Sequence, residues 1–306
     1  MQRKSILGRA FLVFVLGLFA ATAASKGPPA PREPRVTIPA VDCAADTMSV
    51  LRVTWIPPRP DSAETGSVFA TRTTGWSGAR RQRAALTELR SGNMPDFLRA
   101  LKPVHLQHQA RGGATMRATV WVTPDYLAIG SDSDFLRMPL TRPAAVQIAA
   151  DLGFVLPTRK IVDAVYEQAE FRFAPHPLPP GRMMRSSAYY VQHNQIIESE
   201  RVGRPRDELV AGHKKDVVLT NRLVGTQQIA IYGWHRKNGK PIQGLSTVHD
   251  ALYADYSHGV RLVFATVCVD GEVRSFYEVI ADPALGPVLS YEGVIARFRG
   301  LMNPQR

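Results

Sequence analysis

Side chains that can take part in acid–base chemistry or bind a metal are concentrated between residues 213 and 262. Four of the eight histidines in the chain lie in this interval. They are interleaved with carboxylates, tyrosines and basic side chains, whereas a purely structural stretch would carry more aliphatic residues. We therefore predict that the chemistry of the protein is located in this interval.

Five residues of the interval are predicted to be catalytic. An imidazole that is oriented by a carboxylate can act as a general base towards water or a hydroxyl group. The alternative is structural, because histidines at strand ends often bond neighbouring carbonyls and an aspartate can shape a turn. The predicted catalytic residues are His213, Asp216, His249, Asp255 and His258.

The same interval also fits a metal site. Imidazole nitrogens and carboxylate oxygens are ligands that zinc accepts, and a site with three of them and one open position can activate water. The possible ligands of a divalent metal such as zinc are His213, Asp216, His249 and His258. The acid–base and metal versions remain open at this point.

Further polar residues of the interval are predicted to contact a substrate. Basic side chains there could hold an anionic group or stabilise an oxyanion. The predicted substrate-binding residues are Lys214, Lys215, His235, Tyr256 and Arg261.

Two resemblances involve this interval. The segment from Ser257 to Leu262 resembles the signature of L,D-transpeptidases, in which Ser-His-Gly-Cys is followed by an arginine. The likeness covers 14 residues from His249 onward. Val260 stands where that family has its nucleophilic cysteine, and Asp250 stands where it has glycine, which argues against transpeptidase activity.

The second resemblance is broader. Tyr-Gly-Trp-His at 232–235, together with Asp-Tyr-Ser-His-Gly at 255–259, is similar to a group of exported bacterial proteins. This likeness would extend over most of the mature chain. It implies export, but it implies no reaction mechanism.

The N-terminus has the pattern of an export signal. Arg3, Lys4 and Arg9 precede or flank an uncharged apolar run at 10–20, and small residues follow at 21–23. This pattern predicts that residues 1–23 are a signal peptide that is removed, with a retained anchor as the alternative. Removal takes away three of the positive charges, so the formal charge falls from +12 to +9. We expect a periplasmic or extracellular protein.

The basic composition indicates an anionic neighbour. A pI near 10.0 suits an anionic envelope polymer or a cell-wall fragment, although positive charge also serves solubility alone. Nucleic acid is not expected, because no recognition motif or aromatic platform is present. A binding surface for such a polymer would use Arg80, Arg81, Arg83, Lys214 and Lys215.

Hydrophobic patterning predicts an α+β fold with a mainly antiparallel sheet and packed helices. Strands are expected at 48–56, 115–123, 216–220, 228–232 and 260–269, and helices at 78–90, 142–152, 159–169, 191–201 and 291–301. Residues 24–62 are expected to form an extended proline-rich arm and the first strand. Residues 63–306 are expected to form a single globular domain that carries the site at 213–262.

The cysteine content leaves two possibilities. Cys43 and Cys268 are the two cysteines of the chain, and in an exported protein such a pair can form a disulfide. Two buried thiols are the alternative.

The sequence therefore predicts an exported hydrolase-like protein of the bacterial envelope. Its substrate would be a cell-wall peptide or glycan, and a His/Asp cluster would do the chemistry. The alternative is a non-catalytic module that binds an anionic envelope polymer.

Overall fold

The computed structural model describes residues 41, 43, 49–110, 112–295 and 297–303. The predicted signal peptide and nearly all of the proline-rich arm lie outside these residues. Within them the chain forms eight α-helices and mainly antiparallel strands. The predicted α+β fold class is therefore confirmed.

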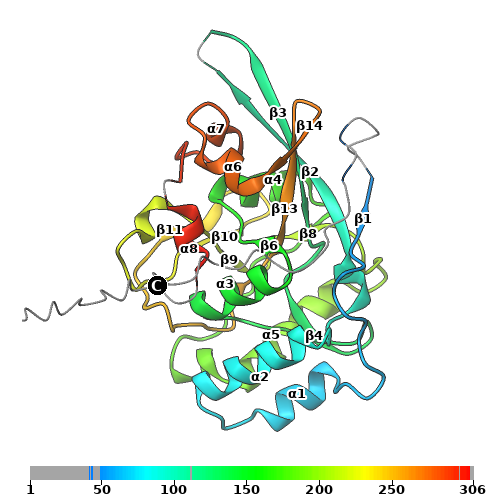
Figure 1. Ribbon diagram of the computed structural model, residues 1–306. Helices are drawn as coiled ribbons and strands as arrows, with labels where there is room; N and C mark the ends of the chain where they lie inside the picture. Colours follow the sequence, from blue (N-terminus) through cyan, green and yellow to red (C-terminus); the bar gives the residue numbers. More distant parts are fainter. Residues whose placement is uncertain (1–40, 42, 44–48, 111, 296, 304–306) are drawn as a thin grey trace, which may run out of the picture. The chain divides into compact units, whose positions relative to one another are not determined.

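The larger sheet has the strand order β1-β2-β3-β13-β14, and β6 also pairs with β13. All its pairs are antiparallel, and the long β2–β3 hairpin dominates it (Figure 1). The predicted strands at 115–123 and 260–269 appear here as β3 and β13. The strands are β1 (Leu51–Arg52), β2 (Ala100–Gln109), β3 (Thr115–Val122), β6 (Phe154–Val155), β13 (Val263–Val269) and β14 (Glu272–Ser275).

A smaller sheet, ordered β11-β10-β9-β12, carries the residues that the sequence singles out. Its strands are β9 (Lys215–Val217), β10 (Ile231–His235), β11 (Pro241–Ser246) and β12 (His258–Gly259). β10 is antiparallel to β9 and β11, whereas β12 runs parallel to β9. Two short pairs complete the strands: β4 (Ala128–Gly130) with β5 (Phe135–Arg137), and β7 (Phe171–Arg172) with β8 (Val210–Ala211).

The predicted helices at 78–90, 142–152 and 159–169 are found with their ends within one residue, and the two later ones differ. The helix expected from residue 191 begins earlier, because Ser186 accepts a hydrogen bond from the backbone of Tyr189 and caps it. The expected C-terminal helix is reduced to one turn. The helices are α1 (Gly66–Arg72), α2 (Gly78–Arg90), α3 (Arg142–Asp151), α4 (Arg159–Gln168), α5 (Ser187–Glu200), α6 (Phe276–Ala281), α7 (Gly286–Leu289) and α8 (Phe298–Leu301).

Helix α4 matters most for the argument that follows. Thr158 caps it by accepting from the backbone N–H of Ile161, as predicted. Its apolar stripe is buried, including Val162 and Val165. None of the described helices combines the length and the apolar composition needed to cross a membrane.

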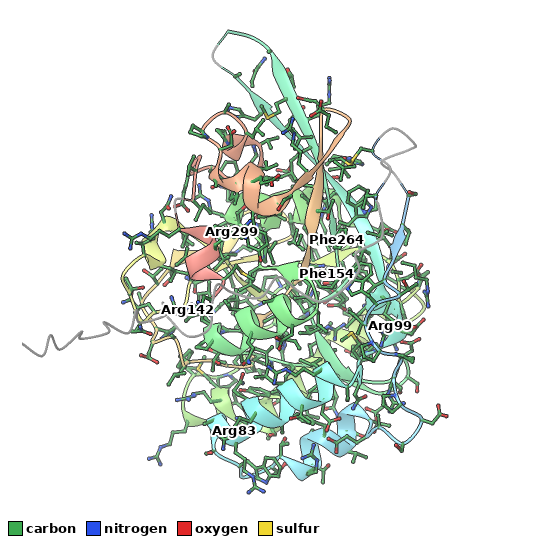
Figure 2. All side chains as sticks on the ribbon, in the orientation of Figure 1. Arg83, Arg99, Arg142, Phe154, Phe264 and Arg299 are labelled. Carbon is green, nitrogen blue, oxygen red and sulfur yellow. A yellow bond between two sulfur atoms is a disulfide. The ribbon has the colours of Figure 1, made fainter. Side chains whose placement is uncertain are left out.

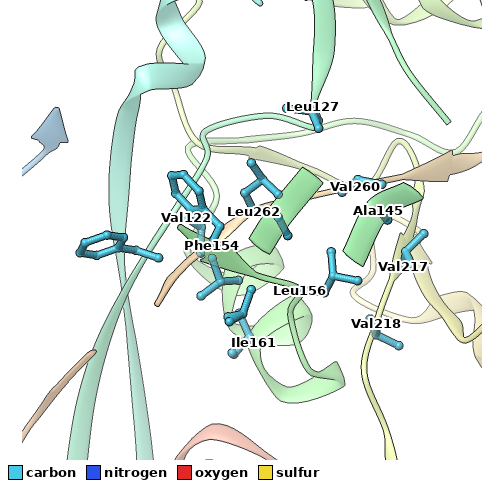
Figure 3. Packing of buried hydrophobic residues seen from close by; sticks show 14 of the residues in the cluster. Val122, Leu127, Ala145, Phe154, Leu156, Ile161, Val217, Val218, Val260 and Leu262 are labelled. Atoms are coloured by element: carbon cyan, nitrogen blue, oxygen red, sulfur yellow. The ribbon is translucent and has the colours of Figure 1, made fainter. Parts of the chain in front are cut away.

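The core joins both sheets. Phe154 of β6 and Phe264 of β13 lie edge to face with ring centroids 6.1 Å apart (Figure 2). Ile161 of α4 and Val217 of β9 belong to the same buried cluster (Figure 3). The helix that borders the smaller sheet is therefore fixed by burial of its apolar side.

Cys43 and Cys268 form a disulfide, with Cα atoms 5.6 Å apart. This resolves the alternative that the sequence leaves open. The bond ties the segment before β1 to strand β13 across 225 positions of sequence.

Removing the disulfide should destabilise the protein. Cross-linking over so long a loop restricts the unfolded chain, and loss of a native disulfide typically costs about 2–5 kcal/mol. We expect a Cys43→Ala/Cys268→Ala variant to unfold at lower urea concentration than the oxidised protein. Reductant should lower the urea midpoint of the native protein but leave that of the variant unchanged; equal midpoints for native protein and variant would contradict the assignment.

Candidate functional site

The predicted catalytic residues do not form one cluster, because the smaller sheet divides them. His258 pairs with Lys215, and Gly259 pairs with Asp216. Paired residues share a face of a sheet and successive residues alternate between faces. His258 therefore points away from the face that carries Asp216.

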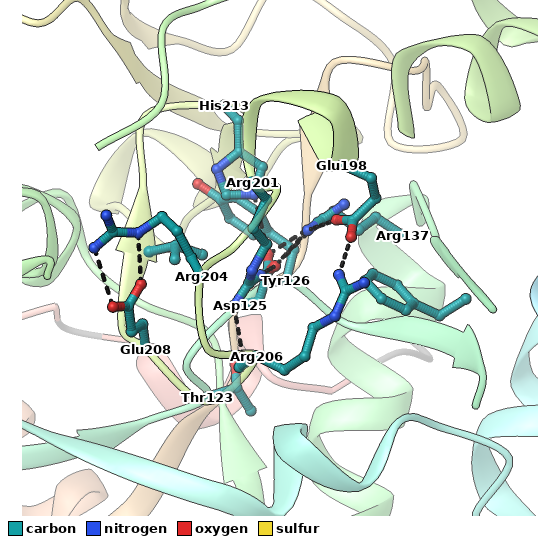
Figure 4. A network of polar contacts seen from close by, with 12 residues as sticks. Thr123, Asp125, Tyr126, Arg137, Glu198, Arg201, Arg204, Arg206, Glu208 and His213 are labelled. Carbon is teal, nitrogen blue, oxygen red and sulfur yellow. Dashed lines mark hydrogen bonds and ion pairs between the residues drawn. The ribbon is translucent and has the colours of Figure 1, made fainter. Parts of the chain in front are cut away.

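His213 belongs to a buried charge network around Asp125 (Figure 4). Asp125 accepts hydrogen bonds from Arg137 at 2.6 Å, from Arg201 at 2.8 Å and from Nε2 of His213 at 3.0 Å. Burial alone would raise the pKa of Asp125, but Arg137 and His213 outweigh it and hold that pKa well below its usual range. The carboxylate stays ionised and links three segments of chain.

His213 itself is kept neutral. Burial lowers its pKa to about 4, although Asp125 acts in the opposite direction. Its ring lies edge-on to Tyr126 and Phe173, with centroids 4.8 and 4.6 Å away. These contacts fix the imidazole in the interior, where its exposed fraction is 0%.

Asp216 and Arg261 are buried beside this network. Asp216 accepts a hydrogen bond from the hydroxyl of Tyr126 at 2.8 Å, and burial raises its pKa to about 6. Arg261 donates to the backbone oxygens of Thr123 and Val210 at 2.6 and 2.7 Å. Arg261 was predicted to bind substrate; in the structure its buried guanidinium joins the residue that follows β3 to strand β8.

The opposite face brings three of the predicted catalytic residues together. Nε2 of His258 is 3.9 Å from Oδ2 of Asp255, and neither ring nitrogen of His258 has a hydrogen-bond partner among the described residues. His249 stacks on Tyr253 at 4.1 Å, and the hydroxyl of Tyr253 donates to Asp255 at 2.9 Å. Burial lowers the pKa of His258 to about 4. We call His249, Tyr253, Asp255 and His258 the His258 cluster.

Only part of the predicted substrate-binding set is accessible. Lys214 is buried and donates to the backbone oxygen of Tyr256, and burial lowers its pKa to about 7. Tyr256 is also buried, and its hydroxyl accepts from the backbone N–H of Leu178 at 2.7 Å. Lys215 is half-buried, with its ammonium group 5.0 Å from the ring of Trp234.

The structure does not unite the proposed metal ligands. His213 and Asp216 make the contacts described above on one side of the sheet, and His249 and His258 lie on the other. In the described part of the chain, no three His, Cys, Asp or Glu side chains are grouped so that they could hold a metal ion. The metal version of the site therefore has no geometric support here.

The predicted polyanion surface is also smaller than expected. Arg81 is buried, where it donates to the side chain of Ser187 and to the backbone oxygen of Arg185. Lys214 is buried as well. Arg80 and Arg83 of α2 remain exposed; Figure 2 labels Arg83.

A second His–Asp pair occurs where the sequence did not indicate one. Nε2 of His235, at the end of β10, is 3.1 Å from Oδ1 of Asp163 on α4. The hydroxyl of Tyr232 donates to the same oxygen at 2.8 Å. The His235 ring stacks on Tyr166 at 4.4 Å with an interplanar angle of 20°. The His235–Asp163 pair is therefore held in place by hydrogen bonds and by stacking on the ring of Tyr166.

A backbone irregularity places His235 there. The β10–β11 register shifts between Ile231 and Gly233, and Trp234 has a φ of 55°. A regular strand would put Trp234, not His235, on the same face as Tyr232. The left-handed residue reverses this, so the Trp234 ring lies by Lys215 while His235 joins Tyr232 at Asp163. Such irregularities re-aim side chains near functional sites.

The His235–Asp163 pair lines an open cavity of about 540 Å³. Because a carboxylate only accepts hydrogen bonds, Nε2 of His235 carries a hydrogen, and in the neutral imidazole the lone pair is then on Nδ1. Burial raises the pKa of Tyr232, and it raises the pKa of Tyr291 to about 12, so both phenols stay protonated donors. The other lining residues are Tyr166, Glu167, Arg172, Lys237, Asn238, Gly239 and Pro241.

Sequence reasoning missed Asp163 and gave His235 only a substrate-binding role. The available signal was a carboxylate inside the amphipathic helix, next to the apolar stripe of Ile161, Val162 and Val165. A solvent-facing aspartate would give the same pattern. Distinguishing the two requires knowing which strand lies against α4.

The comparisons with known proteins add no assignment. Neither a protein-family model, nor a curated protein, nor a solved structure matches the chain. The functional argument therefore rests on geometry.

Buried histidines make stability depend on pH. The folded-state pKa values of His213 and His258 are lowered to about 4, and that of His193 is also lowered, all mainly by burial. A histidine whose pKa is lowered by folding contributes its full stabilisation of the folded state at pH values above its unfolded-state pKa of about 6.5. That contribution is lost as the pH falls from there through the folded-state pKa. Asp216, with a raised pKa, acts in the opposite sense and offsets part of the loss as pH falls from about 6 to about 4.

We therefore expect the free energy of unfolding to fall by several kcal/mol between about pH 6.5 and about pH 4. Urea unfolding across this range measures it. A His258→Gln variant should show a shallower dependence than the native protein. Stability that stays constant or rises towards acid would contradict the neutral, buried state of these rings.

Proposed function

We propose that the protein is an exported hydrolase-like enzyme of the bacterial envelope that acts on a cell-wall peptide or glycan substrate. The observation that carries this is the imidazole of His235, which Asp163 orients at 3.1 Å in the wall of an open cavity. A carboxylate-oriented imidazole beside a substrate-sized cavity is the arrangement that general-base catalysis requires.

The chemistry follows from the tautomer. Nδ1 of His235 takes a proton from a water molecule, and the hydroxide oxygen forms a bond to the carbonyl carbon of an ester or amide. The resulting tetrahedral intermediate collapses as the bond to the leaving oxygen or nitrogen breaks. The protonated His235 gives its proton to that leaving group, and Asp163 stabilises the imidazolium in between.

Positive charge is available for the oxyanion of the intermediate. The guanidinium of Arg159 lies 4.9 Å from the ring centre of Tyr291 and 5.8 Å from that of Tyr232, two residues of the cavity wall. Arg159 has no ion pair with a carboxylate among the described residues. Together with the hydroxyl of Tyr291 it can stabilise developing negative charge, while the hydroxyl of Tyr232 stays bonded to Asp163.

The His258 cluster is the second candidate. What favours it is that both ring nitrogens of His258 are buried without a hydrogen-bond partner in the described chain, 3.9 Å from Asp255. Unpaired buried polar groups are rare and call for an explanation. His258, which is 1% exposed, does not line this cavity, whereas His235, which is 3% exposed, is one of the residues that line it.

Substitution can separate the two candidates. Removing a general base typically lowers the rate by about 10²- to 10⁴-fold. We expect His235→Gln and Asp163→Asn each to cause a loss in this range in the release of soluble products from purified cell walls. His258→Gln, a matched change of a buried imidazole, should retain most of the activity, with folding checked by thermal unfolding.

The opposite pattern, loss in His258→Gln and retention in His235→Gln, would transfer the catalytic role to the His258 cluster. Cell walls left unchanged by the native protein, with salt-sensitive retention on them, would instead favour the non-catalytic module that binds an anionic envelope polymer.

Export is part of the same proposal. Basic, apolar and small-residue segments succeed one another at the N-terminus, and the structure contains the Cys43–Cys268 disulfide, which suits an oxidising compartment. We expect protein isolated from the cell envelope to begin close to residue 24, as N-terminal sequencing would determine. Recovery of the unprocessed chain from the cytoplasm alone would refute it.

A further inference from the structure

A second and larger hollow adjoins the catalytic cavity. It is a trough of about 1380 Å³ bordered by the β2–β3 hairpin, by α4 and by the segment from Pro287 to Gly293. Figure 1 shows α4 and α7 beside this hairpin. Glu167 and Tyr291 line both the trough and the cavity of His235. The two hollows therefore adjoin each other at these two residues.

Helix α4 supplies the boundary between them. Lys160, Ala164 and Glu167 recur at helical spacing and line the trough. Asp163 and Tyr166 lie on the adjacent side of the same helix and line the catalytic cavity. A chain lying in the trough would pass Glu167 to reach His235.

We infer that the trough holds the strand of a polymeric substrate, and that this strand is a glycan with little net charge, in which an acetamido group supplies the amide carbonyl that is attacked. The inference rests on the proposed function, because it assigns the substrate class of the His235 site. A small substrate would need only the cavity, whereas an adjoining trough of about 1380 Å³ suits several consecutive sugar units.

The charges of the trough argue against a polyanion. The two basic residues Arg117 and Lys160 are outnumbered by three acidic ones, although the whole chain is strongly basic; the acidic residues are Glu167, Asp270 and Glu292. Lys160 also donates to the backbone oxygens of Gln107 and Pro287 at 2.8 Å each, so its ammonium group is already engaged. Basic character elsewhere on the chain does not extend into this trough.

Neutral donors and acceptors line the rest. Gln107 and Gln109 are exposed at the β2 side, and their side-chain amides can pair with hydroxyl and acetamido groups. Tyr291, which is 54% exposed, stands at the junction with the catalytic cavity. An aromatic ring beside amides presents an apolar face and hydrogen-bonding groups to a sugar.

The backbone argues against a peptide strand that adds to the edge of β2. Pro103 has no N–H to donate. The N–H and C=O of His105 are bonded to the side chain of Gln168 at 2.9 and 2.7 Å, and the C=O of Gln107 accepts from Lys160. These groups of the β2 edge are therefore occupied, and strand addition requires them.

Binding to a catalytically silent protein tests the inference separately from catalysis. The probes are N-acetylglucosamine oligosaccharides, measured by titration calorimetry with the His235→Gln variant of the full mature chain. We expect the hexasaccharide to bind more tightly than the disaccharide, with little dependence on salt.

Gln107→Ala/Gln109→Ala in the same background should weaken hexasaccharide binding roughly tenfold, since two neutral hydrogen bonds are lost. Gln192→Ala/Gln195→Ala is the matched control: these exposed glutamines of α5 line neither hollow, and binding should be unchanged.

Absence of oligosaccharide binding, equal affinity for the two lengths, or an equal effect of the two double variants would overturn the inference. Tighter binding of polyglutamate or of an uncharged cell-wall peptide would overturn it in favour of that class. If the sugars bind as expected while His235→Gln still hydrolyses cell walls, the trough assignment stands and the catalytic assignment fails.

Discussion

The hydrogen bond between Asp163 and His235 depends on helix α4 lying against strand β10. The apolar side of α4, with Ile161 and Val162, is buried in the core that also holds Val217 of β9. That packing leaves Asp163 at the border of the smaller sheet, where Tyr232 and His235 reach it. Hydrophobic burial, which is not directional, thus fixes the position of a directional polar contact. The cavity and the trough are arranged on either side of this helix.

Sequence patterns were sufficient to predict helices and strands, but they were insufficient to predict which of them lie side by side. The 3.6-residue period of α4 and the capping threonine at 158 are local signals, and both are found in the structure. The interval 213–262 does contain most of the buried polar side chains around the smaller sheet. What it could not reveal is the pairing of β12 with β9, which sets His258 opposite Lys215 and separates it from Asp216. A one-residue difference in register exchanges the two faces of a strand.

The position of His235 could not be predicted from the sequence either, because it depends on the backbone conformation of a single residue. Alternation along Tyr232 to His235 predicts that Trp234 shares the face of Tyr232, and the positive φ of Trp234 reverses this. The residue types do not predict this conformation, because a positive φ is unusual for tryptophan. Asp163, for its part, could be recognised only once the strand beside α4 was known.

Many of the polar residues that stand out in the sequence are buried, where they bond to one another or to the backbone. Asp125 binds two arginines and His213, and Arg261 bridges the backbone oxygens of Thr123 and Val210. These groups are costly to bury and are satisfied by one another.

The central claim concerns a different histidine, His235, and the protonation state of its ring can be observed directly. Nitrogen-15 shifts of the His235 ring, recorded with and without the N-acetylglucosamine hexasaccharide, would test it. The account predicts hydrogen on Nε2, a free lone pair on Nδ1, and a change at Nδ1 when the sugar binds; hydrogen on Nδ1, or a response confined to His258, would contradict it.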